Sequence, residues 1–357
     1  MIISRTPFRI SFFGGGTDYP SWYRTHGGQV LATTIDKYCY LTCRYLPPFF
    51  DHRISVAYSK IELCQTVDDI THPAVRAILR HLGITRGVAI KHDADLPARS
   101  GMGSSSAFTV GLLNALLALK GHMPSKQQLA KEGIHVEQDL LKEHVGSQDQ
   151  VLAAVGGFNH IVFSPNGEIS VRPMTLSAER SRELNDHLML FYTGIKRTAS
   201  VIAASFVPSI QEKERELKIL SDMVTESISI LTSGGSIVKF GELLHEAWKT
   251  KQALSPLVSN PEVAGMYEAA RSAGAIGGKL LGAGGGGFML LFVPPRHQRD
   301  VREQLRGFIH VPFNFEFGGS QVVYFQPEND YAEEEKFRVA QSFRPFQELI
   351  PNPIQEI

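Results

Sequence analysis

The sequence predicts an α+β protein built from two domains. Its 357 residues exceed the size at which a chain usually keeps one hydrophobic core, and 43% of them are hydrophobic. Residues 1–65 are rich in β-branched and aromatic residues between Gly, Pro and charged breaks, which indicates a sheet. From about residue 188 the pattern changes to long amphipathic stretches, which indicate helices. We therefore expect one domain over residues 1–180 and a second over residues 181–357.

The elements of the first domain follow from local patterns. Strands are predicted where β-branched and aromatic residues cluster, and helices where apolar residues recur three or four positions apart. A Pro-Asn-Gly turn at residues 165–167 predicts a hairpin. In chain order we expect three extended segments within residues 1–65, a short helix at 73–82, a strand before Pro97, a glycine-rich loop and helix over 101–119, and a helix at about 125–143.

The second domain is predicted to alternate strands with helices. It opens with the strand LMLFYTG at residue 188 and closes with the glycine-containing strand pair KLLGAGGGGFMLLFV. The segment from Ala332 onward is charged and then rich in Pro, so we expect a peripheral addition. Between the two strand regions, helices are expected at 211–233, 236–254 and 260–274.

Composition limits the partners of this protein. Lys plus Arg and Asp plus Glu both number 36, so no bulk positive charge would collect nucleic acid or an anionic membrane. Three cysteines without metal-ligand companions give no disulfide framework, and we expect a cytoplasmic location. The first residues, MIISRTPFRISFF, contain no uninterrupted apolar stretch long enough for a signal peptide or a membrane span. A small molecule is the expected partner, and the protein is expected to be a monomer or a homodimer.

The segment GMGSSSA at 101–107 is a candidate phosphate-binding loop, because it follows a strand and opens a helix. A well-capped turn would have the same composition. No lysine follows Gly103 as the Walker A pattern requires, and Ser106 stands where a dinucleotide fingerprint needs glycine. Ala107 likewise excludes a nucleophile elbow. The candidate phosphate-binding residues are Gly101, Met102, Gly103, Ser104, Ser105 and Ser106.

Three ordered segments carry a family resemblance: TPFRISFFGGGTDY at 6–19, LPARSGMGSSSA at 96–107 and KLLGAGGGGF at 279–288. Together they resemble the signature motifs of the galactokinase, homoserine kinase, mevalonate kinase and phosphomevalonate kinase (GHMP) superfamily. The resemblance implies an N-terminal domain of mixed sheet and helix with a left-handed βαβ unit, against the usual right-handed rule, and a C-terminal ferredoxin-like domain. It also implies that ATP and the substrate meet between the two domains.

The same resemblance implies roles for individual residues. Asp149, in GSQDQ, takes the position of the catalytic aspartate of the sugar kinases in this superfamily, and Arg9 takes that of the basic residue in their first motif. Glu137 lies where the family places a Mg²⁺ ligand, with Ser105 as its partner. Taken alone, an Asp after a helix is usually a cap, and a Glu on a helix flank is usually exposed.

The first motif also bears on the substrate. Gly15 and Gly16 stand where galactokinases carry Glu-His, while Thr17, Asp18 and Tyr19 are retained. The exchange opens space and offers two extra backbone N–H donors, which would tolerate a larger or anionic sugar. Here the chain resembles the D-glycero-D-manno-heptose 7-phosphate kinases, which phosphorylate the anomeric hydroxyl to give the 1,7-bisphosphate.

The resemblance therefore implies a sugar phosphate as substrate and ATP with Mg²⁺ as cofactors. Lys196 and Arg197 are candidates for holding the substrate's existing phosphate, and Gly284 and Gly285 for approaching the substrate from the second domain. A solvated basic helix start would explain the two cations equally well. Alternative functions are a kinase for fucose, mannose or galactose, or a sugar-sensing homologue without activity.

Overall fold

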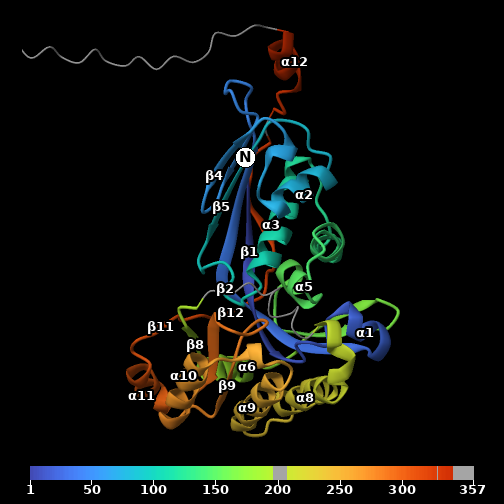
Figure 1. The fold of residues 1–357 in the computed structure, drawn as a ribbon. Helices are drawn as coiled ribbons and strands as arrows, with labels where there is room; N and C mark the ends of the chain where they lie inside the picture. The colour runs from blue at the N-terminus through green and yellow to red at the C-terminus, as the bar shows by residue number, and fades with distance from the viewer. Residues whose placement is uncertain (196–206, 328, 341–357) are drawn as a thin grey trace, which may run out of the picture.

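The computed structural model describes residues 1–195, 207–327 and 329–340, which form two β-sheets with their helices (Figure 1). In the described chain, the first sheet has nine strands in the order β13-β1-β2-β5-β3-β4, with β6 and β12 also pairing with β2 and β7 with β6. The long centre is β1 (Ile2–Phe13) against β2 (Gly28–Tyr45). The remaining strands are β3 (Ile54–Ala57), β4 (Ile61–Cys64), β5 (Val88–Ala94), β6 (Asn159–Phe163), β7 (Ile169–Pro173), β12 (Phe315–Glu316) and β13 (Gln321–Phe325).

Helices α2, α3 and α5 lie along one side of this sheet (Figure 1). The most deeply buried is α3, because its residues from Ser106 to Leu116 are all buried and apolar residues surround its axis. The helices of this half are α1 (Pro20–His26), α2 (Pro73–His81), α3 (Ser104–Leu119), α4 (Lys126–Ile134) and α5 (Gln148–Val155).

The predicted helix at 125–143 is interrupted. After α4, the chain widens into a π-helical turn at His135–Leu140, which closes with a hydrogen bond from the Leu141 N–H to the Val136 carbonyl, 2.9 Å. Such turns insert one extra residue and re-aim the side chains within them. The π-helical turn directs Glu137 into the interior, where its side chain is fully buried.

The second sheet confirms the predicted ferredoxin-like arrangement. Its strand order is β11-β8-β10-β9, all antiparallel, so the fourth strand in chain order lies beside the first and the third beside the second. The strands are β8 (Leu188–Tyr192), β9 (Gly277–Leu280), β10 (Phe288–Phe292) and β11 (Ile309–His310). The helices are α6 (Ala178–Asp186), α8 (Glu214–Thr232), α9 (Val238–Gln252), α10 (Pro261–Ser272) and α11 (Gln298–Gln304).

Two strands from the predicted second domain, 181–357, pair with strands of the first sheet. Strand β13 pairs antiparallel with β1, with Ile2 opposite Phe325, and β12 pairs with β2. Residues 315–325 therefore lie in the sheet of the first domain. The physical reason is that β1 has a second edge of backbone N–H and C=O groups, which β13 satisfies. The domain division at residue 180 stays a prediction.

The C-terminal helix α12 (Ala332–Ala340) extends from the far end of the first sheet (Figure 1). Glu335 attaches it there, because its carboxylate accepts hydrogen bonds from Arg53 and from the Gly87 N–H, both 2.9 Å. Residues 341–357 lie outside the described residues. No described helix combines the length and the apolar character that crossing a membrane requires.

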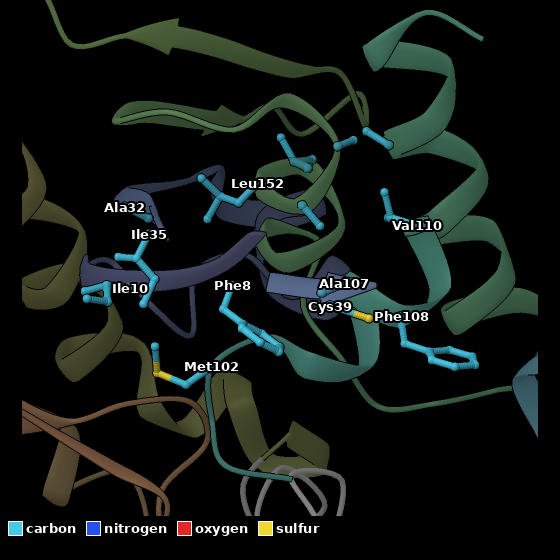
Figure 2. Close-up of a cluster of buried hydrophobic side chains, with 14 of the residues drawn as sticks. Phe8, Ile10, Ala32, Ile35, Cys39, Met102, Ala107, Phe108, Val110 and Leu152 are labelled. Carbon is cyan, nitrogen blue, oxygen red and sulfur yellow. The ribbon is translucent and has the colours of Figure 1, made fainter. Parts of the chain in front are cut away.

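The two sheets share one hydrophobic core. Phe12 and Phe13 at the end of β1 pack edge-to-face on Phe240 of α9, with ring centroids 5.5 and 5.1 Å apart. Met102, in the middle of the glycine-rich loop, is also fully buried. Figure 2 shows it among the buried side chains, with Phe8 and Ile10 of β1. Burial of Met102 anchors the loop to the core.

Two glycine-rich loops hold the halves together by backbone contact. A Cβ atom on Gly282 would lie 2.5 Å from Gly101 Cα, and one on Gly287 would lie 2.1 Å from the Ser100 carbonyl oxygen. Any side chain at these positions would force the backbones apart, because real Cβ atoms do not approach so closely. The segments at residues 100–101 and 282–287 therefore lie against each other as the resemblance implies.

Replacing Gly282 by alanine tests this contact. Gly282 has φ +71°, and Gly83 has φ +62° with nothing within 4 Å of a Cβ atom, so Gly83→Ala is a matched control for the backbone strain alone. We expect Gly83→Ala to lower the free energy of unfolding by about 1–2 kcal/mol and Gly282→Ala by about 3 kcal/mol or more, measured by urea denaturation. Equal losses would show that the contact between the loops contributes nothing.

Candidate active site

Arg9 and Asp149 form a bidentate ion pair at the junction of β1 and α5. Arg9 donates through Nε to Asp149 Oδ1 and through Nη2 to Oδ2, both at 2.6 Å. The Arg9 guanidinium is buried, while the Asp149 side chain keeps 24% of its surface exposed. Paired hydrogen bonds fix the plane of a carboxylate as well as its position. The carboxylate is thus held in one orientation and remains accessible to a reactant.

The glycine-rich loop lies directly on this pair. Arg9 Nη1 donates to the Gly101 carbonyl, 2.6 Å, and the Arg9 backbone N–H donates to the Met102 carbonyl, 3.1 Å. A Cβ atom on Gly103 would lie 3.1 Å from Arg9 Cγ and 3.4 Å from Asp149 Oδ2. Only a residue without a side chain fits here without displacing a neighbour. The predicted proximity of residues 9 and 149 to segment 101–107 is confirmed.

The start of α3 is suited to an anion. Its N-cap is Gly103, in the left-handed conformation with φ 72°, and among the described residues no side chain caps the helix. The first N–H groups of a helix have no partner within it, and the helix dipole is positive at that end. These N–H groups fit a phosphate. The Met102 side chain lies in the core, so only its backbone could contribute.

Behind the loop, Glu137 is surrounded by hydrogen-bond donors. Its Oε1 accepts from Ser105, 2.9 Å, and Thr109, 3.2 Å, while Oε2 accepts from Ser106, 2.7 Å, and from Gln150. Burial raises the pKa of Glu137 to about 7, against the lowering effect of these hydrogen bonds. Because Gln150 follows Asp149, this network joins the start of α3 to the first helical turn of α5, which carries Asp149.

The turn at residues 14–19 is locked to the same segment. Asp18 accepts hydrogen bonds from the Gly16 N–H, 3.0 Å, and from Gln148 Nε2, 2.9 Å. Burial, and then the nearby Asp149 carboxylate, raise the pKa of Asp18. The pKa of Tyr19 is likewise raised by burial and then by the charges of Asp18 and Asp149.

Two predicted contacts in this turn differ from expectation. The Gly16 N–H is donated to Asp18, so it is not the free donor that the sequence predicted. A short loop that buries a carboxylate must satisfy it with the nearest N–H groups. The Thr17 hydroxyl donates to the carbonyls of Gly14, 2.8 Å, and Gln29, 2.9 Å, so it stabilises the turn.

Two unpaired polar atoms near Gly15 were missed from the sequence. Among the described residues, Ser11 Oγ and Gln148 Oε1 are buried without a hydrogen-bond partner. A Cβ atom on Gly15 would lie 3.7 Å from Ser11 Oγ and 3.8 Å from Gln148 Nε2. Buried polar atoms normally have partners, so these two indicate a polar ligand. Their positions in the sequence could have indicated them, because Ser11 lies on the same strand face as Arg9 and Gln148 directly precedes Asp149.

Other predicted residues lie elsewhere or outside the description. Gly284 and Gly285 are buried against the segment that precedes α10, where the Gly285 N–H donates to the Val258 carbonyl, 2.9 Å. That N–H is therefore not available to a substrate, and Gly282 and Gly287 make the contacts with the glycine-rich loop instead. Lys196 and Arg197 fall within 196–206, outside the described residues.

Two lysines near Arg9 were also missed. Lys279 of β9 is buried and donates to the Phe12 carbonyl, 2.7 Å, and Lys251 at the end of α9 donates to the carbonyls of Leu280, 3.1 Å, and Gly282. Lys251 follows an amphipathic helical pattern, which usually places a lysine in solvent. Lys279 lies just before the glycine run, and only this position in the sequence could have indicated that it lies near the site.

Comparison with known proteins agrees with these features. Residues 69–157 match the family of GHMP kinases N terminal domains, and residues 223–310 match the GHMP kinases C terminal family. The D-glycero-alpha-D-manno-heptose 7-phosphate kinase of Campylobacter jejuni is 28% identical over 316 residues, covering 85% of this chain and 93% of that protein. A mevalonate kinase of Pyrococcus abyssi is 30% identical over 337 residues, covering 86% and 92%.

Solved structures show the same fold. A D-glycero-D-manno-heptose 1-phosphate kinase from Bacteroides thetaiotaomicron superposes with a TM-score of 0.73 at 24% identity, covering 91% of this chain and 100% of that one. The mevalonate kinase of Methanococcus jannaschii gives a TM-score of 0.68 at 18% identity, covering 88% and 98%.

Proposed function

Because the chain belongs to the GHMP kinase family, we propose that it phosphorylates the anomeric hydroxyl of D-glycero-D-manno-heptose 7-phosphate to give the 1,7-bisphosphate. Whichever sugar it uses, the chain is an ATP-dependent phosphotransferase that acts on a sugar hydroxyl. The observation that carries the proposal is the Arg9–Asp149 pair beneath Gly103, which joins an oriented carboxylate to the uncapped start of α3. The similarity to the heptose kinase of Campylobacter jejuni supports the choice of the heptose.

The chemistry expected of these residues is modest. Phosphoryl transfer depends mainly on alignment and on neutralising charge, and ATP supplies the phosphoryl group when bound. Asp149 would orient the anomeric hydroxyl and accept its proton, while Arg9 keeps the carboxylate plane fixed. Gly15 leaves room for the sugar, with Ser11 and Gln148 offering polar contacts to its hydroxyls. A sensor without catalysis would not need the oriented pair.

We also propose that Ser105 and Glu137 hold Mg²⁺. Both offer oxygen atoms, which Mg²⁺ prefers, and the ion usually keeps several waters and binds phosphate oxygens. Its chemistry would be to neutralise charge on the phosphates. Among the described residues, no group of three or more His, Cys, Asp or Glu side chains could hold a metal by itself. Ser105 is the exposed member of the Glu137 network, so its hydroxyl is the one free to turn.

A substrate panel tests the assignment of the sugar. ADP release would be measured with D-glycero-D-manno-heptose 7-phosphate, the unphosphorylated heptose, fucose, mannose, galactose and mevalonate. We expect kcat/KM for the heptose 7-phosphate to exceed every other value by about 100-fold or more, because a site built around a polar group rejects ligands that lack it. A preference for a free hexose or for mevalonate would refute the heptose assignment and leave the kinase class intact.

Asp149→Asn tests the catalytic assignment. The change keeps the side chain's shape but removes the proton acceptor, so we expect turnover to fall by about 10²–10⁴ while ATP affinity is unchanged. Asp139→Asn is the control, because Asp139 is an exposed carboxylate paired with His135, and its turnover should match wild type. Near-wild-type turnover of Asp149→Asn would remove Asp149 from the mechanism.

Glu137→Gln tests the metal assignment. We expect the Mg²⁺ concentration for half-maximal activity to rise by about 10-fold or more, because the residues around a metal set its affinity. Glu137 is fully buried, so Ser105→Ala is the companion variant: Ser105 is exposed, and its loss leaves three donors on the carboxylate. If both variants fold and titrate with Mg²⁺ like wild type, the metal lies elsewhere.

A further inference from the structure

Lys251 and Lys279 bring two ammonium groups from the C-terminal half of the chain to the Arg9–Asp149 site. They come from different elements, the end of α9 and strand β9, and their hydrogen bonds converge on one region. Lys251 holds the carbonyls of Leu280 and Gly282, and Lys279 holds that of Phe12. Neither residue is required by the catalytic roles proposed above.

Backbone contacts connect Lys251 to the reacting groups. The Gly282 carbonyl that accepts from Lys251 belongs to a residue packed on Gly101, and the Gly101 carbonyl accepts from Arg9. The two cations therefore lie on either side of the contact between the glycine-rich loops. The charged groups that act on Lys251 are Arg9 and Asp18, with Lys279 beside it.

The lysines are not neutralised within the protein. In the part of the chain that the structure describes, no carboxylate lies within 4.0 Å of either ammonium group, and their acceptors are backbone carbonyls. Asp149 is already paired with Arg9, and Asp18 accepts from Gly16 and Gln148. Lys279 is buried and Lys251 is half-buried. An ammonium removed from water without a counter-ion is costly, and carbonyl oxygens compensate only part of that cost.

An anionic ligand would supply the missing charge. Lysine binds phosphate as a compact point charge with three donors, and the described contacts of Lys251 use two of them. Burial, and then the nearby Arg9 guanidinium, lower the pKa of Lys251 to about 7. The Lys251 ammonium would therefore lose its proton readily in the empty site, and a bound phosphate would restore it.

We propose that Lys251, supported by Lys279, binds a phosphate oxygen of the ligand at the Arg9–Asp149 site and so determines its selectivity for phosphorylated ligands. The phosphate is either the monoester already on the sugar or the terminal phosphate of the nucleotide. In the first case the inference rests on the proposed function, because it names the contact that recognises a phosphorylated sugar. In the second it is independent of which sugar is used.

Calorimetric titration with three ligands tests the proposal. These are D-glycero-D-manno-heptose 7-phosphate, the same heptose without phosphate, and a non-hydrolysable ATP analogue. At pH 8, above the pKa of Lys251, wild-type protein should take up close to one proton when a phosphate binds beside Lys251, measured as a heat that depends on the ionisation enthalpy of the buffer. The phosphorylated ligand that shows this uptake identifies the source of the phosphate.

Variants of Lys251 separate recognition from structure. Lys251→Met should abolish proton uptake and weaken that one phosphorylated ligand by about 10-fold to 100-fold, without affecting the unphosphorylated heptose. Lys251→Arg should keep the affinity but show no uptake, because arginine stays charged. Lys249→Met, two residues earlier on the same helix and exposed beside Glu246, is the matched control and should behave like wild type.

Each outcome decides the question. The proposal is overturned if Lys251→Met binds all three ligands with wild-type affinity. It is also overturned if the wild-type protein binds the phosphorylated ligands without taking up a proton, and this measurement does not depend on whether Lys251→Met folds. If neither heptose binds the wild-type protein, the proposed function has failed, and the ATP analogue alone then decides whether Lys251 binds phosphate.

Discussion

Backbone contact between the loop at Gly101 and the loop at Gly282 is the constraint on which the geometry of the site depends. The two backbones approach so closely that neither position can carry a side chain. On one side the contact presents a carbonyl to Arg9, and on the other it presents a carbonyl to Lys251. The contact between the two loops thus sets the positions of Arg9 and Lys251, and it sets that of Asp149 through the ion pair with Arg9.

The site uses a few strong contacts rather than many weak ones. The Arg9 side chain donates hydrogen bonds both to Asp149 and to the Gly101 carbonyl, so it holds the catalytic carboxylate and the phosphate-binding loop at once. Behind them, Glu137 gathers donors from α3 and α5 and fixes the relative position of the two helices. A network of this kind keeps reacting groups in place before a ligand arrives, which is what phosphoryl transfer requires.

Much of this could be predicted because glycines, local turns and charged pairs leave marks in the sequence. The family resemblance, from the first two motifs and from GSQDQ, predicted that residues 9, 149 and 101–107 belong to one site, and they do lie together. Lys251 could not be predicted, since its helical pattern indicates exposure and only the packing of β9 against α9 half-buries it. The π-helical turn at Glu137 and the use of the Gly16 N–H by Asp18 depend equally on tertiary contacts. Strand β13 left no sign, because pairing between residues over 300 positions apart has no local signature.

The position of β13 late in the chain also affects how the protein folds during synthesis. Ile2 finds its partner in Phe325, so the first strand emerges from the ribosome long before its outer neighbour has been translated. Until then β1 carries an unpaired edge, which is the kind of surface that promotes association between nascent chains. The first sheet is therefore complete only after residues 321–325 have been translated, and a chain that stops before residue 321 lacks an edge strand of the sheet that carries Arg9.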